Sequence, residues 1–377
     1  MHITSWYTDN FEDRLQGRYI TLKHLEPILD SYREVFNVSV AGTSEMGLDI
    51  PLVICGRGPK KVLIWSQMHG NESTTTKALF DFFKFMNSNE GQSAVLLASH
   101  TFYVLPMLNP DGAALYIREN VNKVDLNRDA QQLSQRESIV LKSLFDSIQP
   151  DICLNMHDQR SIFGLADGFP ATVSFLAPAA EILKSITPAR QEAMALIVKM
   201  TRYLKDHCPN QIGRFDDTFN QNCMGDAFSS LGVPTILFEA GHYTNDYNRE
   251  QTRSFVFYAL IALCAPEDGK HNVSLDYKEY YMLPENKKNF HDLVLYNVRT
   301  PGDAILKTVC FQYKEVLIGA TILFDLYVAR IEVDTAVYGH QTFDLQGGRI
   351  LLNSHENIII NKKILTIFDI NKNLILI

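Results

Sequence analysis

The amino-acid sequence predicts an α/β protein, a mixed sheet flanked by helices, with a smaller β-rich domain at its C-terminal end. Short apolar runs alternate with segments of helical periodicity over the first two thirds of the chain, which is typical of a sheet covered by helices on both faces. The polar stretch Ala265–Asn272 then predicts a linker. Beyond it, segments such as Ala320–Glu332 are rich in β-branched and aromatic residues. We therefore expect two domains, residues 1–265 and 273–377.

Length and composition exclude several classes of protein. The chain has 377 residues, and at roughly 100–200 residues per domain this also favours two or three domains. Hydrophobic residues make up 46% of the chain, which argues against extensive disorder. The balance of 35 basic and 43 acidic residues gives a net charge of −8, so neither a nucleic acid nor an anionic membrane surface is expected as a partner. The oligomeric state stays open.

Apolar runs mark the expected strands, and helical periodicity marks the expected helices. Residues 73–76 are available to cap the start of the expected helix Lys77–Met86. The expected strands are Asn37–Val40, Leu52–Cys55, Val62–Trp65, Phe102–Leu105, Ile152–Leu154 and Thr235–Phe238, with two more in Lys363–Ile377 around a turn at Asn371–Asn373. The expected helices are Thr21–Phe36, Lys77–Met86, Glu137–Ile148, Arg190–His207, Met224–Leu231 and Asn248–Leu263.

The cysteines and the N-terminal sequence indicate in which cellular compartment the protein is expected. The six cysteines are scattered and form no C-x-x-C pair, so we expect free, mostly buried thiols in a reducing compartment. The first residues contain no basic stretch followed by an apolar one, and we therefore expect no signal peptide in this sequence and a cytoplasmic location.

The strongest local signal for chemistry is a histidine and a glutamate three residues apart. His69 and Glu72 follow the run Val62–Trp65 and precede a helix. Both can donate a lone pair to Zn²⁺, and Gly70 between them allows a tight loop that brings them to one point. Taken alone the pair is weak, since such pairs are common on solvated surfaces.

Catalytic zinc usually has three protein ligands and a water, so a third ligand is needed. His157 is the candidate, because it ends the run that begins at Ile152 and would lie, like His69, at the carboxyl end of a buried strand. Binding sites in open α/β sheets form at these ends. The alternative is that His157 only caps a core strand.

Three further segments carry polar residues, and each has a purely structural interpretation. Asn109–Gly112 has the composition of a turn. Asp125 and Arg128 would form a surface ion pair of small energetic value. Glu239 would contact a helix N-terminus from the end of its strand.

Taken together and in order, these segments resemble the zinc carboxypeptidase family over residues 61–243. The resemblance rests on H-x-x-E, N-P-D-G, an arginine, D-L-N-R, a distant histidine and a late glutamate. The arrangement is also similar to the related deacylases that act on succinylglutamate and N-acetylaspartate. Both groups place a metal site on an α/β sheet, so the resemblance implies a carboxypeptidase-like fold.

The resemblance implies a role for each residue. His69, Glu72 and His157 would bind one Zn²⁺ ion, and Asp125 would accept a hydrogen bond from the far nitrogen of His69. Glu239 would be the general base that takes a proton from a metal-activated water, and Arg118 would stabilise the oxyanion. Asn127 and Arg128 would bind the terminal carboxylate of the substrate.

Two departures from the family pattern concern the substrate. Peptide-cleaving members usually have a tyrosine about twenty residues before the glutamate, whereas no tyrosine occurs between Tyr203 and Glu239. His157 is followed by Asp158, Gln159 and Arg160 in place of small or hydroxylated residues.

The predicted function is that of a zinc-dependent metallocarboxypeptidase, a hydrolase that cleaves an amide bond next to a free carboxylate in a small peptide. One alternative is a deacylase of N-acyl amino acids. The other is a non-catalytic module that binds peptide ends, although such a module has no need for Glu239.

Overall fold

The structure is a computed structural model that describes residues 3–266, 276–302, 304–333, 336–369 and 374–376. The expected turn at 371–373 and most of the expected linker lie outside these residues. The chain packs into two compact units. Unit 1 contains Met1–Gln159 and Ala171–Glu285, and unit 2 contains Arg160–Pro170 and Asn286–Ile377. Whether the two ranges expected as domains fold independently stays a prediction.

Unit 1 is built on an eight-stranded mixed sheet with the strand order β1-β2-β4-β3-β5-β8-β6-β7. Its centre is parallel, because β3 pairs in parallel with both β4 and β5, and β5 pairs in parallel with β8. The central strands are buried on both faces, as their continuous apolar runs predict. The strands are β1 Asn37–Thr43, β2 Asp49–Gly56, β3 Lys60–Ser66, β4 His100–Leu105, β5 Ile152–Asp158, β6 Val173–Leu176, β7 Ile212–Arg214 and β8 Thr235–Ala240.

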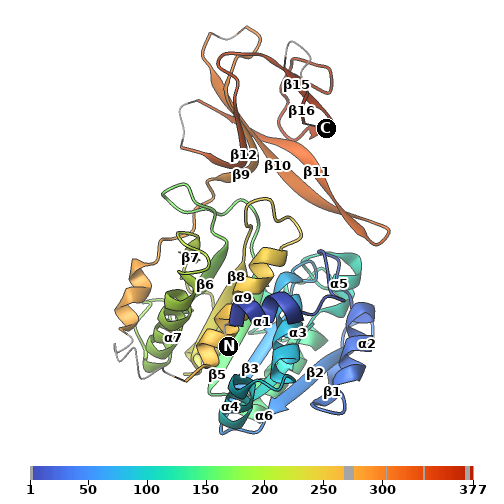
Figure 1. Ribbon diagram of the computed structural model, residues 1–377, viewed down its shortest axis with the longest axis vertical. Helices are drawn as coiled ribbons and strands as arrows, with labels where there is room; N and C mark the ends of the chain where they lie inside the picture. The colour runs from blue at the N-terminus through green and yellow to red at the C-terminus, as the bar shows by residue number, and fades with distance from the viewer. Residues whose placement is uncertain (1–2, 267–275, 303, 334–335, 370–373, 377) are drawn as a thin grey trace. The chain divides into compact units, whose positions relative to one another are not determined.

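Helices cover both faces of this sheet (Figure 1). Between the helices and the sheet lie two hydrophobic cores, one on each face. The first core lies under α1 Ile3–Asn10, α2 Leu22–Tyr32, α3 Thr74–Met86, α4 Gly91–Ser99, α7 Pro188–Leu204 and α9 Glu250–Cys264. The second lies under α6 Arg136–Ile148 and α8 Met224–Ser230. Unit 1 also contains α5 Pro110–Leu115 and two 3₁₀ helices, η1 Leu126–Arg128 and η2 Tyr277–Met282. The predicted fold class is confirmed.

Unit 2 consists of two sheets around a core of its own. Residues 160–170 belong to this unit although they follow β5 directly: the carbonyl of Ser161 contacts His340 Nε2 at 2.8 Å, and the side chain of Asn289 donates to Leu165. One sheet has the order β12-β9-β10-β11-β14, and the other β13-β15-β16. The strands are β9 Phe290–Val298, β10 Lys307–Ile318, β11 Thr321–Glu332, β12 Tyr338–Asp344, β13 Ile350–Leu352, β14 Lys363–Ile364, β15 Ile367–Asp369 and β16 Leu374–Leu376.

Two local expectations are wrong, for identifiable reasons. Residues 109–112 form more than a turn: Asn109 accepts a hydrogen bond from the backbone N–H of Gly112, and Pro110 opens the short helix α5. Ser73, expected among the caps of α3, makes no capping hydrogen bond, because its hydroxyl donates to the carbonyl of Arg18 at 2.6 Å.

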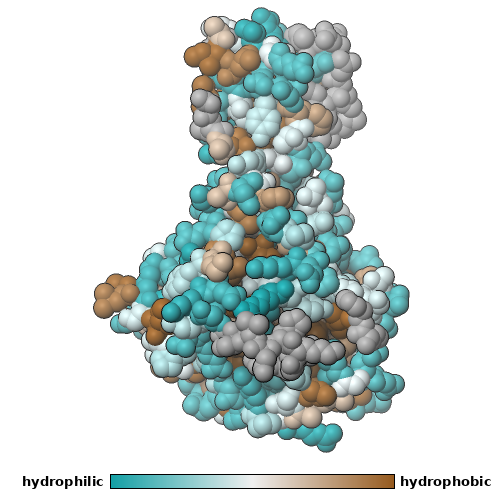
Figure 2. All heavy atoms as spheres, turned by 60° about the vertical axis from the view of Figure 1, so that its left-hand side comes forward, coloured by the Kyte–Doolittle hydropathy of each residue, from teal (hydrophilic) through white to brown (hydrophobic). Residues whose placement is uncertain are grey.

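The surface gives no sign of a large apolar face on the side that Figure 2 shows. Hydrophilic side chains predominate there, and the hydrophobic ones gather in small separate groups. Among the described residues, no helix combines the length and the apolar character that a membrane span requires.

Candidate active site

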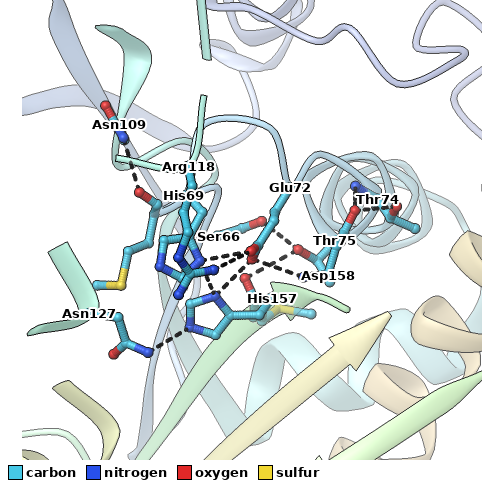
Figure 3. Close-up of polar contacts among 12 residues, drawn as sticks. Ser66, His69, Glu72, Thr74, Thr75, Asn109, Arg118, Asn127, His157 and Asp158 are labelled. Carbon is cyan, nitrogen blue, oxygen red and sulfur yellow. Dashed lines mark hydrogen bonds and ion pairs between the residues drawn. The ribbon is translucent and has the colours of Figure 1, made fainter. Parts of the chain in front are cut away.

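Three side chains expected to bind a metal converge at the carboxyl end of the sheet of unit 1. His69 and Glu72 lie in the loop between β3 and α3, and His157 lies near the end of β5, the strand next to β3. One ligand atom from each lies within 4.8 Å of the others, and all three residues are buried. Figure 3 shows the two imidazole rings and the carboxylate pointing toward one another.

The donor atoms suit a zinc ion. The two Nδ1 atoms of His69 and His157 are 3.1 Å apart, and each lies next to a different oxygen of Glu72, at 2.8 Å for His69 and 2.9 Å for His157. Two imidazole nitrogens and a carboxylate form a ligand set that Zn²⁺ prefers in catalytic sites. The residues present therefore fit the ion.

The charges of the three groups are strongly coupled. Burial alone would raise the pKa of Glu72, but His69 and His157 outweigh it and hold this pKa well below its usual range. Burial would lower the pKa of His69, yet the charge of Glu72 and a hydrogen bond to Asp125 raise it. For His157 burial dominates and lowers the pKa. The site thus favours an ionised Glu72 and a neutral His157.

The loop that carries His69 and Glu72 is held by the N-P-D-G segment. A Cβ atom at Gly70 would lie 2.0 Å from the carbonyl carbon of Gly112, so the two backbones touch and only glycine fits at position 70. The side chain of Asn109 donates to the carbonyl of Met68 at 3.1 Å. The segment expected as a turn therefore supports the loop that carries His69 and Glu72.

Asp125 contacts His69, and Arg118 contacts both Asp125 and Glu72. Asp125 Oδ1 is 3.0 Å from His69 Nε2, so this carboxylate can fix the tautomer in which Nδ1 faces Glu72. Arg118 donates to Asp125 and to Glu72, each at 3.1 Å. Burial would lower the pKa of Arg118, but these two carboxylates raise it. Asp125 therefore does not form the ion pair with Arg128 that was the structural alternative.

Asp158 is a further residue of this site that the sequence reasoning did not assign. Its backbone N–H donates to Glu72 Oε2 at 3.1 Å. Its Oδ2 accepts from the backbone N–H and the hydroxyl of Thr74, at 3.0 and 2.6 Å, at the start of α3. Asp158 thus connects the end of β5 with the helix that follows Glu72. No local pattern in the sequence indicates this role, since Asp158 and Thr74 are 84 residues apart.

Glu239 lies beside His157, because these two residues are register partners in the parallel pair β5–β8. Burial raises the pKa of Glu239 well above its usual range, and the negative charges of Glu72 and Asp158 add to this. Among the described residues, none donates a hydrogen bond to its carboxylate. The group is therefore available for proton transfer next to the candidate metal ligands.

Asn127 and Arg128 lie in η1, whose N-cap is Asp125. Asn127 Oδ1 accepts from the backbone N–H of Met224 at 3.1 Å, and its Nδ2 lies 3.5 Å from His157 Nε2. Arg128 is exposed, and its Nη1 donates to the carbonyl of Asn127 at 2.7 Å and to Cys223 Sγ at 3.0 Å. Cys223 is a second residue that sequence reasoning did not assign to the site.

Comparison with protein families confirms the predicted resemblance. Residues 21–157 match the family model described as zinc carboxypeptidase. The matched segment contains His69, Glu72 and His157 and ends before Cys223 and Glu239. No curated protein matches the chain in sequence.

Solved structures with the same fold include several metallocarboxypeptidases. The metallo-carboxypeptidase of Burkholderia cenocepacia is 17% identical with a TM-score of 0.54, and the alignment covers 64% of this chain and 68% of that one. The metallo-carboxypeptidase of Pseudomonas aeruginosa, solved with (2-guanidinoethylmercapto)succinic acid, is 16% identical with a TM-score of 0.52, covering 65% and 68%. Carboxypeptidase A of Helicoverpa armigera is 15% identical with a TM-score of 0.52, covering 66% and 75%. At this identity the comparison shows that the fold is shared.

Proposed function

Because residues 21–157 match the zinc carboxypeptidase family, we propose that this protein is a zinc-dependent hydrolase that cleaves the amide bond next to a free carboxylate, most simply the C-terminal bond of a small peptide. The observation that carries the proposal is the convergence of His69, Glu72 and His157 with Glu239 on the neighbouring strand. A module that only binds peptide ends would need no such carboxylate.

His69, Glu72 and His157 would hold one zinc ion through two Nδ1 atoms and a carboxylate. When bound, zinc polarises a carbonyl oxygen and lowers the pKa of a coordinated water to about 7. Asp125 would keep His69 in the required tautomer by accepting from its Nε2–H.

Glu239 would act as the general base and then return the proton to the leaving amine. A base must hold a proton transiently, and a carboxylate whose pKa is raised by burial does so better than one fully solvated. General acid–base catalysis of this kind contributes about 10²–10⁴-fold to the rate.

Two arginines would have separate roles, one in stabilising the transition state and one in binding the substrate. Arg118, held against Glu72 and Asp125, would face the negative charge that develops on the carbonyl oxygen of the scissile bond. Arg128, exposed and next to Asn127, would bind the carboxylate of the substrate through its planar fork of N–H groups. This pairing would select chain ends over internal bonds.

The decisive experiment replaces Glu239 with glutamine and measures zinc content and turnover together. Glu239→Gln should bind one zinc per chain, as we expect of the parent, and lose about 10²–10⁴-fold in kcat. Glu181→Gln, on an exposed stretch, is the matched control and should behave as the parent. Turnover by Glu239→Gln at the parent rate would refute the assignment of the base.

Substrate class is tested with peptide pools that end in either a free carboxylate or an amide, beside N-acyl amino acids. Cleavage of free-acid peptides alone supports the carboxypeptidase. Preferential cleavage of N-acyl amino acids would favour the deacylase, which the lack of a tyrosine between Tyr203 and Glu239 also favours. Tyr243 is no obvious replacement, because its ring packs edge-on against Phe255 at 5.7 Å. No turnover of either class by a zinc-loaded protein would favour the binding module.

We further propose a reducing compartment, in line with a cytoplasmic location. All six cysteines are free thiols, and five of them are buried. Free thiols on this scale are usual for proteins kept in reducing surroundings.

A further inference from the structure

We propose that Cys223 is a positioning residue for Arg128: its neutral sulfur orients the guanidinium so that one edge stays open for a substrate carboxylate. The inference rests on the proposed function, in which Arg128 binds that carboxylate. It goes further because it assigns carboxylate recognition to a pair of residues, one of which lies outside the segment that matches the family.

The hydrogen bonds of Arg128 determine which of its donors remain open. A guanidinium has five N–H groups, two on each Nη and one on Nε. Nη1 donates to the carbonyl oxygen of Asn127 at 2.7 Å and to Cys223 Sγ at 3.0 Å, which uses both of its hydrogens. Within the described part of the chain, Nε and Nη2 make no hydrogen bond or ion pair. The open donors therefore lie along one edge, and two parallel N–H groups on one edge match the two oxygens of a carboxylate.

The sulfur of Cys223 is held in place by its own surroundings. The carboxylate of Asp226 lies close enough to interact with the thiol and can accept its proton, which would leave the sulfur lone pairs free to accept from Arg128. The chain around Cys223 is tied to the chain around Arg128 as well: the N–H of Ala130 donates to the carbonyl of Asn222, and the N–H of Met224 donates to Asn127. The contact between Arg128 and Cys223 is thus part of a fixed junction between two segments.

A thiol at this position orients Arg128 without cancelling its charge. Burial raises the pKa of Cys223 to about 11, so the group is a neutral thiol at physiological pH. A carboxylate in its place would also hold the guanidinium, but it would neutralise the charge that the substrate needs. A neutral acceptor leaves the positive charge of Arg128, which is exposed, available to an incoming anion.

The experiment measures how strongly the 377-residue protein retains peptides with free C-terminal carboxylates relative to the same peptides as amides. Parent and variants all carry Glu239→Gln so that the peptides are not cleaved, and both pools are compared by equilibrium dialysis and mass spectrometry. Cys223→Ala and Cys223→Val both remove the acceptor, and valine also preserves the volume. We expect each to lose about tenfold in the preference for acids, the effect of one hydrogen bond to a charged group. Cys223→Ser keeps an acceptor and should stay within about threefold of the parent. Asn222→Ala, at the neighbouring position, is the control and should match the parent, because the junction uses only the backbone carbonyl of Asn222.

A kinetic measurement separates positioning from general damage to the fold. With cleavable acid peptides, Cys223→Ala should raise KM about tenfold and change kcat little, and serine should restore KM. A loss of kcat with unchanged KM, or a loss that serine does not restore, would overturn the inference.

The failure of this inference is distinguishable from the failure of the proposed function. If the parent prefers acids and Arg128→Ala abolishes the preference, while Cys223→Ala and Cys223→Val retain it, the role of Cys223 is refuted and the proposed function stands. If the parent binds acids and amides equally, carboxylate recognition by Arg128 is refuted, and the role of Cys223 with it.

Discussion

Replacing Asp158 with alanine should weaken both the fold of unit 1 and its affinity for zinc. Asp158 Oδ2 accepts from the backbone N–H and the hydroxyl of Thr74. It is the acceptor at the start of α3, since Ser73 makes no capping bond. Loss of an acceptor at a helix start costs about 0.5–2 kcal/mol, and the hydroxyl bond adds about 1 kcal/mol. We therefore expect Asp158→Ala to lose about 1.5–3 kcal/mol of unfolding free energy.

The effect on zinc follows from the position of Asp158 next to two of the proposed zinc ligands. Its backbone N–H donates to Glu72, and His157 precedes it in β5. Residues that orient metal ligands in this way typically change metal affinity by about 10–100-fold when they are replaced. We expect a loss in that range for Asp158→Ala, whereas Asp158→Asn, whose amide oxygen can accept the same two bonds, should stay within about threefold of the parent.

Two measurements check this prediction. Urea unfolding can be followed by the fluorescence of Trp6 and Trp65, which are both buried in unit 1, and zinc affinity can be measured by competition with a chromophoric chelator. The reasoning is refuted if Asp158→Ala binds zinc as tightly as the parent, because Asp158 would then hold neither ligand in place.

Two further predictions concern the buried ionic groups between the N-terminal segment, α3 and α9. Asp81→Ala leaves the buried guanidinium of Arg253 without the carboxylate that it contacts at 2.6 and 2.7 Å. Urea unfolding should therefore show a loss of about 3–5 kcal/mol in unfolding free energy. A loss below about 1 kcal/mol would contradict this prediction. Burial lowers the pKa of Lys77 from 10.5 to about 8, so between these pH values the unfolded chain binds more protons than the folded one. Stability should therefore rise with pH across this window, by on the order of 3 kcal/mol, relative to Lys77→Met, and parallel stability curves for the two proteins would refute this.

Much of unit 1 could be predicted because short, continuous stretches of sequence indicate its strands. The runs that became β3, β5 and β8 are continuously apolar, as expected for strands buried on both faces. His69 and His157 follow such runs, so their meeting at one edge of the sheet could be expected. Their roles as metal ligands, like the role of Glu239, stay predictions.

What could not be predicted depends on contacts between distant segments. Residues 109–112 have the composition of a turn, and the same asparagine and proline also begin a helix, so composition could not distinguish the two. Asp158 and Cys223 meet their partners across 84 and 95 residues of sequence. No spacing or periodicity in the chain indicates such pairs.

The membership of residues 160–170 in unit 2 has a consequence for the order in which the chain matures. Ser161 contacts His340, and β12, which carries that histidine, ends at Asp344, roughly 170 residues after this segment. At about 5–20 residues per second, a ribosome needs on the order of 10–35 s to synthesise the intervening chain. During that time, residues 160–170 have left the ribosome, but the strands of unit 2 that they contact have not yet been synthesised. The last ligand of the candidate metal centre is therefore synthesised early, while the segment beside it can adopt its final structure only near the end of translation.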